Sequence, residues 1–188
     1  SGARIIREAE LARLDMVMSF SFKDSRTNYL IYPSQSYKTV SWHFFVHQDN
    51  YSKFRFEQLS DLSGAVIGAV NGWAYTPEFW GAGLNIRPVS KHTLLLNMLL
   101  RSRIDLAPLN TVETLYELKH RGLKNRIVYL PKPLVARPYF NAFVKKSKHP
   151  NKERVMRGYD ALVKRLLEEG YVDQVYDFYL KEREFGRK

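Results

Sequence analysis

The sequence predicts an α/β fold with two lobes, the second of them doubly wound, and three observations support this. In the middle of the chain, short apolar runs alternate with amphipathic segments at the spacing of stacked βαβ units. The parts on either side carry strand and helix patterns but too few strands for two separate sheets. With 45% hydrophobic and 26% charged residues, the 188-residue chain has the composition of a globular protein.

The N-terminal part is predicted to hold one helix and two strands. Apolar residues at helical spacing indicate an amphipathic helix that ends near Arg13. Residues 14–19 are typical of a short strand. A stronger β segment covers 39–47, where aromatic and β-branched residues dominate. Residues 20–38, between these strands, are polar and rich in turn formers.

The middle of the chain has the most regular pattern. Thr76 before Pro77 is typical of a helix start. Ser90 is expected to cap a second helix over 91–101, whose apolar face would hold Leu94, Leu95, Met98 and Leu99. Asn110 with Glu113 has the spacing of a capping box before a third. Four strands are predicted around these helices, at 65–70, 85–89, 104–108 and 127–130. We therefore assign residues 47–130 to one lobe with a mainly parallel sheet.

The C-terminal part has a different pattern. A strand is predicted at 139–144, then helices at 151–169 and 171–182 with Gly170 between them. These helices need a sheet to pack on, and the strands of the N-terminal part supply one. Residues 1–46 and 131–188 are thus predicted to form the other lobe. Two chain crossings would make a hinge with a ligand cleft between the lobes.

Composition excludes several function classes. The chain has no cysteine, which rules out disulfides and thiolate zinc sites. No apolar run reaches the roughly 20 residues of a membrane-spanning helix. The net charge of +11 suggests nucleic-acid binding, but the basic residues are spread along the chain and no RNA-binding or zinc-finger motif accompanies them. We expect a solvated basic surface and no nucleic-acid partner. His43 and His47 would share a strand face, but without further ligands we expect no metal site.

Five segments of the chain occur in the order of a known motif set. They are LDMV at 14–17 with SFSFKDSR at 19–26, YLIYPS at 29–34 with Tyr37, FEQLSDLSGAVIGAVNG at 56–72, RIDLA at 103–107, and EGYVD at 169–173. Together they resemble the family 3 bacterial extracellular solute-binding proteins, the polar-amino-acid receptors of ABC importers. The resemblance implies a periplasmic-binding-protein-like fold, in which the first lobe would lack its first strand and helix.

The resemblance also implies a function and partners. The chain would be a periplasmic receptor, not an enzyme, and would capture an amino acid or related carboxylate by hinge closure. It would deliver this ligand to the permease of an ABC transporter, as a monomer without a cofactor. Two alternatives stay open. One is the ligand-sensing domain of a membrane signalling protein. The other is a periplasmic dehydratase-like enzyme, for which Glu113 is the candidate acid–base group.

The positions that match the family's ligand-binding residues in the first lobe are Arg26, Ser19 and Ser21. A planar guanidinium suits a bidentate contact with a ligand carboxylate. Serines two apart on a strand can face the same cleft. The simpler alternatives are a surface arginine in a polar turn and ordinary strand-edge serines.

In the second lobe, the resemblance points to Gly72, Trp73, Ala74 and Asn110. Relatives usually have hydroxyl residues at 73 and 74, so donors there would come from the backbone, and Trp73 would stack on the ligand or pack with Phe79 and Trp80. Relatives have aspartate where Asn110 stands. Asparagine accepts a hydrogen bond without bringing a charge. The alternative for Asn110 is a plain helix cap, with Glu113 as substitute acceptor.

Overall fold

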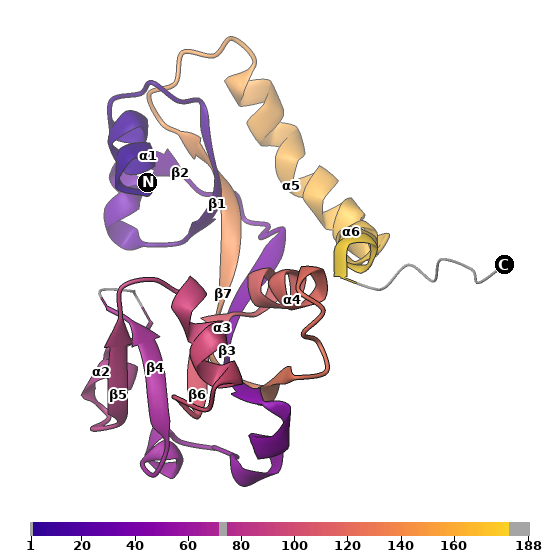
Figure 1. Cartoon of the computed structure of the whole chain (residues 1–188). Helices are drawn as coiled ribbons and strands as arrows, with labels where there is room; N and C mark the ends of the chain where they lie inside the picture. The colour runs from indigo at the N-terminus through magenta and orange to yellow at the C-terminus, as the bar shows by residue number, and fades with distance from the viewer. Residues whose placement is uncertain (1, 72–74, 181–188) are drawn as a thin grey trace, which may run out of the picture. The chain divides into compact units, whose positions relative to one another are not determined.

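A computed structural model describes residues 2–71 and 75–180 of the chain (Figure 1). The chain divides into two compact units. Unit 1 consists of residues 1–39 and 137–188, and unit 2 of residues 40–136. The chain therefore passes from one unit to the other twice. Both units combine β-strands with α-helices, which confirms the predicted α/β class.

Unit 2 contains a sheet with a parallel centre. Its strands are β3 (Lys38–His47), β4 (Val66–Val70), β5 (Asn85–Val89), β6 (Leu106–Asn110) and β7 (Ile127–Val144), of which β3 and β7 continue into unit 1. The strand order is β7-β3-β6-β4-β5. β4 is parallel to both β5 and β6, as expected for an apolar run buried between βαβ crossovers. β3 is antiparallel to β6.

The helices of unit 2 begin mostly where caps predict them. They are α2 (Pro77–Gly81), α3 (Thr93–Leu100) and α4 (Thr111–His120), with 3-10 turns η2 (Gln48–Lys53) and η3 (Leu59–Leu62). Thr76 caps α2 by accepting a hydrogen bond from the Phe79 N–H. The predicted cap of α3 is wrong, because this helix begins after His92 and not after Ser90. The buried face also differs from the prediction: Leu96 is buried, whereas Leu94 is 44% exposed.

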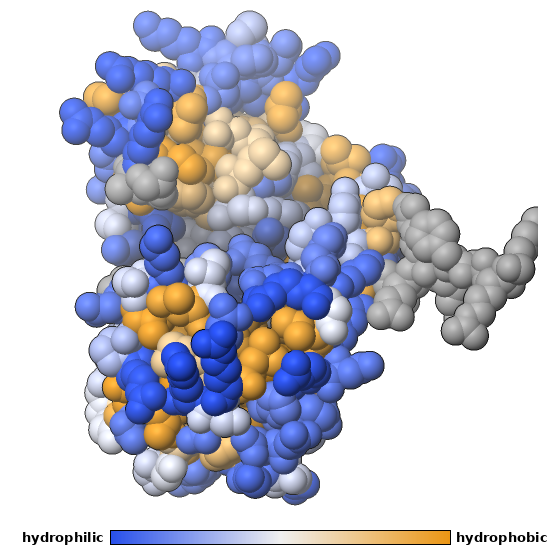
Figure 2. All heavy atoms as spheres, in the orientation of Figure 1, coloured by the Kyte–Doolittle hydropathy of each residue, from blue (hydrophilic) through white to orange (hydrophobic). Residues whose placement is uncertain are grey.

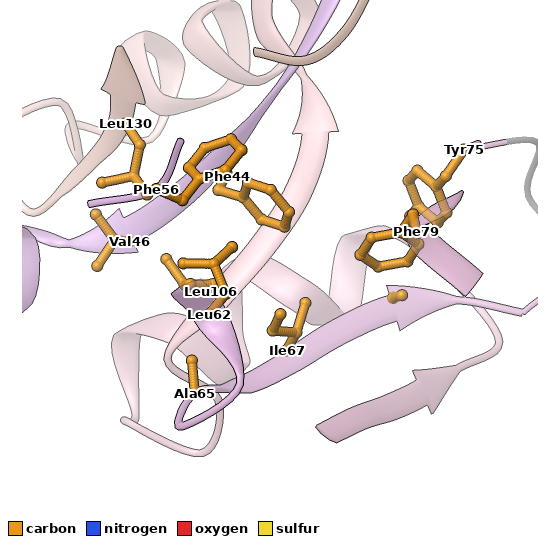
Figure 3. Packing of buried hydrophobic residues seen from close by; sticks show 11 residues of the cluster. Phe44, Val46, Phe56, Leu62, Ala65, Ile67, Tyr75, Phe79, Leu106 and Leu130 are labelled. Carbon is orange, nitrogen blue, oxygen red and sulfur yellow. The ribbon is translucent and has the colours of Figure 1, made fainter. Parts of the chain in front are cut away.

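The core of unit 2 consists of two clusters of buried residues, and Figure 3 shows the one that contains Phe44. Because successive strand residues point to opposite faces, Phe44 and Phe45 enter different clusters. Phe44 packs edge-to-face on Phe56, with ring centroids 5.1 Å apart, and also contacts Phe79. Phe45 belongs to the cluster that buries the apolar face of α3. Both phenylalanines are fully buried.

Unit 1 is built around the C-terminal part of β7. Its other elements are α1 (Gly2–Glu10), β1 (Met16–Ser21), η1 (Asp24–Asn28), β2 (Leu30–Ile31), α5 (Lys152–Glu168) and α6 (Tyr171–Leu180). β1 and β2 both pair with β7 in antiparallel register. A small core joins α1 to these strands through Ala9, Val17 and Leu30. Gly170 separates the two C-terminal helices with a φ of +68°, a conformation that glycine adopts without strain.

The strand β7 differs from its prediction. Two strands were expected, at 127–130 and 139–144, but one strand of 18 residues covers both and the residues between them. Pro131, Pro133 and Pro138 lie in this strand. The fixed φ of proline is compatible with extended backbone, and the residue before a proline also favours an extended conformation. The three prolines therefore remove hydrogen-bond donors without ending the strand.

Figure 2 shows hydrophilic side chains over much of the visible face, with apolar patches between them. This agrees with a basic chain whose charges are dispersed in the sequence.

Asp160 links α5 to the loop before β3. Its carboxylate accepts hydrogen bonds from the Ser34 hydroxyl at 2.7 Å, the Ser34 N–H at 3.1 Å and the Gln35 N–H at 2.9 Å. Partial burial raises the pKa of Asp160, but these hydrogen bonds outweigh that effect and leave the pKa below its usual value. We expect Asp160→Ala to lower the free energy of unfolding by about 1 kcal/mol, because the site is largely solvent-exposed.

The pH dependence follows from the lowered pKa. Carboxylate groups of this kind stabilise the fold above the unfolded-state pKa, and the stabilisation is lost as pH falls through the lower folded-state pKa. Urea unfolding of wild type and Asp160→Ala at about pH 7 and about pH 3 measures this. The difference between the two proteins should shrink at the lower pH. A difference that persists unchanged there would contradict the ionic contribution.

Candidate functional site

The strand β1 carries two of the predicted ligand residues, and it is irregular at the first. The register with β7 shifts between Val17 and Phe20, which is a β-bulge. Ser19 lies in this bulge with a φ of +58°, a value that residues other than glycine rarely adopt. Its N–H donates to the Asn141 Oδ1 at 3.2 Å, and its hydroxyl hydrogen-bonds the Tyr37 hydroxyl. Bulges and strained residues of this kind are frequent beside functional sites.

Ser21 has different partners from Ser19. Its carbonyl accepts from the Tyr32 hydroxyl at 3.1 Å and from the Arg26 Nη1 at 2.9 Å. The Arg26 Nη1 also lies 3.4 Å from the Ser21 hydroxyl. The strand alternation that predicted a shared face for both serines does not extend through the bulge at Ser19. The structure therefore joins Ser21, and not Ser19, directly to Arg26.

Arg26 is held in one orientation over β1. It lies in η1, and its guanidinium carbon is 4.8 Å from the centroid of the Phe20 ring. The hydrogen bonds to Ser21 use Nη1 alone. Since a guanidinium carries five N–H donors, the bonds to Ser21 and a hydrogen bond with the Tyr29 hydroxyl do not use all of them. Burial raises the pKa of the nearby Tyr29 hydroxyl, and the positive charge of Arg26 opposes this.

Asn110 caps α4 in unit 2. Its Oδ1 accepts a hydrogen bond from the Glu113 N–H at 3.1 Å, so the helix-cap role is present. A carbonyl oxygen has two lone pairs, and one of them remains for a ligand. The Glu113 side chain is not part of a reciprocal capping box here; only its backbone takes part.

Ser41, His43 and Thr111, the first residue of α4, form a polar cluster that was not predicted from the sequence. The Thr111 hydroxyl donates to the Ser41 carbonyl at 2.9 Å and contacts the His43 Nδ1 at 2.6 Å. The Ser41 hydroxyl donates to Thr111 at 3.1 Å. Burial lowers the pKa of His43, while the Pro131 carbonyl opposes this. Ser41 and His43 are two apart on a strand, but nothing in the sequence links them to a threonine about 70 residues later.

Three predicted residues, Gly72, Trp73 and Ala74, lie outside the described residues. Next to them, the Val70 N–H donates to the buried hydroxyl of Tyr75 at 3.2 Å. Tyr75, Phe79 and Trp80 form an aromatic cluster with ring centroids 5.2 to 5.7 Å apart. The segment between β4 and α2 is therefore followed by a firmly packed helix start.

Metal ligands, membrane-spanning helices and the distribution of the predicted residues over the two units also bear on the nature of the site. Within residues 2–71 and 75–180, no group of three or more His, Asp or Glu side chains is arranged to hold a metal ion. None of the helices in this part of the chain is long and apolar enough to cross a bilayer. Arg26, Ser19 and Ser21 belong to unit 1 and Asn110 belongs to unit 2.

Comparisons with known proteins connect this architecture to solute receptors. No protein-family model matches the chain, and no curated protein sequence matches it. Many solved structures do match. Substrate-binding domain 2 of GlnP from Lactococcus lactis, in an open conformation, is 18% identical with a TM-score of 0.73, over 96% of this chain and 75% of that one.

Two further structures give the same result. The L-cystine solute receptor of Neisseria gonorrhoeae, in its unliganded open conformation, is 13% identical with a TM-score of 0.73, over 97% of this chain and 73% of that one. The GluR0 ligand-binding core in complex with L-glutamate is 14% identical with a TM-score of 0.72, over 96% and 78%. The chain thus has the fold of the amino-acid solute-binding domains.

Proposed function

We propose that the chain is an extracytoplasmic solute receptor that binds an amino acid or a related small carboxylate for ABC-type import. The observation that carries this proposal is the orientation of Arg26. Its guanidinium is fixed by Ser21 and Phe20, yet not all of its N–H donors are used. A fixed fork of donors is suited to a carboxylate because little side-chain entropy is lost when the ligand binds.

The other predicted residues have complementary roles in this proposal. The hydroxyls of Ser19 and Ser21 add neutral hydrogen-bonding groups from unit 1. From unit 2, Asn110 offers its remaining lone pair to the ligand's ammonium group, and Gly72, Trp73 and Ala74 offer backbone donors and an aromatic surface. An amide oxygen lacks the charge of a carboxylate, so we expect the ammonium to be held less tightly than the carboxylate.

The similar structures support the ligand class. They include the GluR0 core with L-glutamate, the L-cystine receptor, and an amino-acid ABC transporter substrate-binding protein bound to L-arginine. We extend this class to the present chain as part of the proposal. The periplasmic location, the permease partner and the monomeric state belong to the same proposal.

The proposal is of a receptor and not of an enzyme. One similar structure is an ancestral amino-acid-binding protein described as a precursor of cyclohexadienyl dehydratase. The candidate acid–base group for such chemistry is Glu113, whose backbone N–H donates to the Asn110 side chain that caps α4. We expect no turnover of prephenate by this chain. If the chain turns over prephenate and Glu113→Gln abolishes this turnover, the protein is a dehydratase-like enzyme and the receptor proposal is wrong.

A thermal-shift screen tests the receptor function. L-Glutamate, L-glutamine, L-arginine and L-cystine are added to the protein, each with its carboxamide analogue as matched control where this is available. A ligand at about 100 times its Kd adds about 2.7 kcal/mol, which is a rise in Tm of roughly 5 to 10 °C for a chain of this size. The carboxamide should give a much smaller rise, because it cannot accept a bidentate contact from Arg26. No rise with any of these amino acids would refute the proposed ligand class.

A further inference from the structure

Unit 1 contains a pocket that the proposed function does not use. Its volume is about 490 Å³, within the usual range of small-molecule sites. It lies between strand residues around Tyr37 and Asn141 and the facing sides of α5 and α6. All the lining residues belong to unit 1, and Ser21 and Arg26 are not among them.

The walls of this pocket are apolar and aromatic. Leu166 on α5 and Val175 on α6 contribute aliphatic surface, and tyrosines at positions 37, 159, 171 and 176 contribute four rings. Part of this surface is open, since Val175 is 40% exposed and Tyr171 is 54% exposed. Figure 2 shows apolar side chains at the place where Figure 1 draws α6. Aromatic walls favour a ligand that carries a ring itself.

One wall holds a hydroxyl group without a partner. Tyr159 Oη is shielded from solvent and has no hydrogen bond within normal limits in the described part of the chain. Burial raises the pKa of this hydroxyl, and the nearby Asn141 side chain opposes the effect. A buried hydroxyl without a partner is unfavourable, so a ligand oxygen that accepts from it should strengthen binding.

The pocket also has a cationic residue and firmly held walls. Among the described lining residues, Lys38 is the one with a formal charge, and its Nζ lies 5.3 Å from the centroid of the Tyr37 ring. Tyr37 and Asn141 are both hydrogen-bonded to Ser19, which fixes them without a ligand. Asp160, next to Tyr159, ties α5 to the loop at Ser34. The strand side of the pocket and the start of its α5 side are therefore held by contacts within unit 1, and a small movement of the Tyr159 ring would bring its hydroxyl to the ligand.

We propose that this pocket binds an arylalkyl carboxylate, with its ring among the tyrosines, its carboxylate accepting from the Tyr159 hydroxyl, and Lys38 supplying the opposite charge. The apolar walls disfavour free polar amino acids, because the lining residues within 2–71 and 75–180 offer a ligand ammonium no acceptor with a negative charge. This second ligand is thus chemically distinct from the one proposed for Arg26.

The experiment uses 4-phenylbutyrate as the probe and nuclear magnetic resonance of the whole chain as the readout. We expect saturable binding with a Kd of about 1 mM or below, and chemical-shift changes that concentrate at residues 37–38, 159–166 and 171–176. Two matched probes separate the contributions. 4-Phenylbutanol, which lacks the charge, should bind about threefold more weakly, and 4-phenylbutylamine more weakly still.

Three variants test the geometry. Leu166→Trp fills the pocket and should weaken 4-phenylbutyrate binding at least tenfold, whereas Leu167→Trp, on the neighbouring residue that does not line the pocket, should leave it unchanged. Tyr159→Phe should weaken binding about fivefold. It should not lower the Tm of the free protein, because it removes a hydroxyl that has no partner there. A purely structural tyrosine would show the opposite pattern.

Two outcomes would overturn this inference. One is no saturable binding of 4-phenylbutyrate, or binding that Leu166→Trp leaves intact. The other is concentration-dependent dimerisation that Val175→Asp abolishes, since the exposed apolar surface of α6 would then serve a second copy of the chain. Neither outcome touches the amino-acid screen, which depends on Arg26 and not on these residues.

Discussion

Replacement of Phe44 by alanine is expected to lower the free energy of unfolding by about 3 to 5 kcal/mol. Phe44 is fully buried in the middle of β3. Its ring meets Phe56 edge-to-face with an interplanar angle of 89°, and it also packs on Phe79 (Figure 3). Truncation removes both contacts and leaves a cavity that the surrounding sheet cannot close.

Equilibrium urea unfolding, followed by circular dichroism, measures this effect. Phe44→Leu keeps most of the volume and should cost about half as much or less. Leu94→Ala is the matched control in the same unit, because this leucine is 44% exposed and should change stability by no more than about 0.5 kcal/mol. Equal effects of Phe44→Ala and Leu94→Ala would mean that the core of unit 2 is not packed as described.

Local signals in the sequence were sufficient to predict most of the helices and strands of unit 2. Thr76 before Pro77 and Asn110 before Glu113 are caps whose geometry depends on neighbouring residues only. Both caps form, but at Asn110 the capping box suggested by the spacing is only half present, because the Glu113 side chain takes no part. The apolar run that forms β4 is bounded by turn formers, and its parallel pairing follows from its burial on both faces. Ser90 failed as a cap because serine preference alone does not fix where the first helical turn closes.

The site was less predictable because its geometry depends on residues far apart in the sequence. Ser19 has a left-handed backbone conformation, which a sequence usually signals by a glycine, and here the residue is a serine. Its partners Tyr37 and Asn141 lie 18 and 122 residues away. The Arg26–Ser21 contact spans only five residues, but the resemblance implied ligand contacts for both residues and no contact between them. Long-range hydrogen bonds of the first kind leave no periodic pattern in a sequence.

Arg26→Ala is expected to have the largest effect on ligand binding. Loss of the charge-assisted contact should raise the Kd of the amino acid selected by the thermal-shift screen by about 10- to 150-fold, which corresponds to about 1.5 to 3 kcal/mol. Arg26→Lys keeps the charge but not the planar fork, so its Kd should fall between those of wild type and the alanine variant. Isothermal titration calorimetry measures both.

The fold should survive this change, which makes the test decisive. Without Arg26, the Ser21 carbonyl still accepts a hydrogen bond from the Tyr32 hydroxyl, so no buried acceptor is stranded on β1. The Tm of the unliganded variant should therefore stay within a few degrees of wild type, roughly the shift for 1 kcal/mol. The carboxamide of the same amino acid gives the internal control, because it should bind wild type and Arg26→Ala almost equally. If the free amino acid also binds both proteins equally, Arg26 only braces β1 through Ser21, and the carboxylate must be recognised elsewhere or not at all.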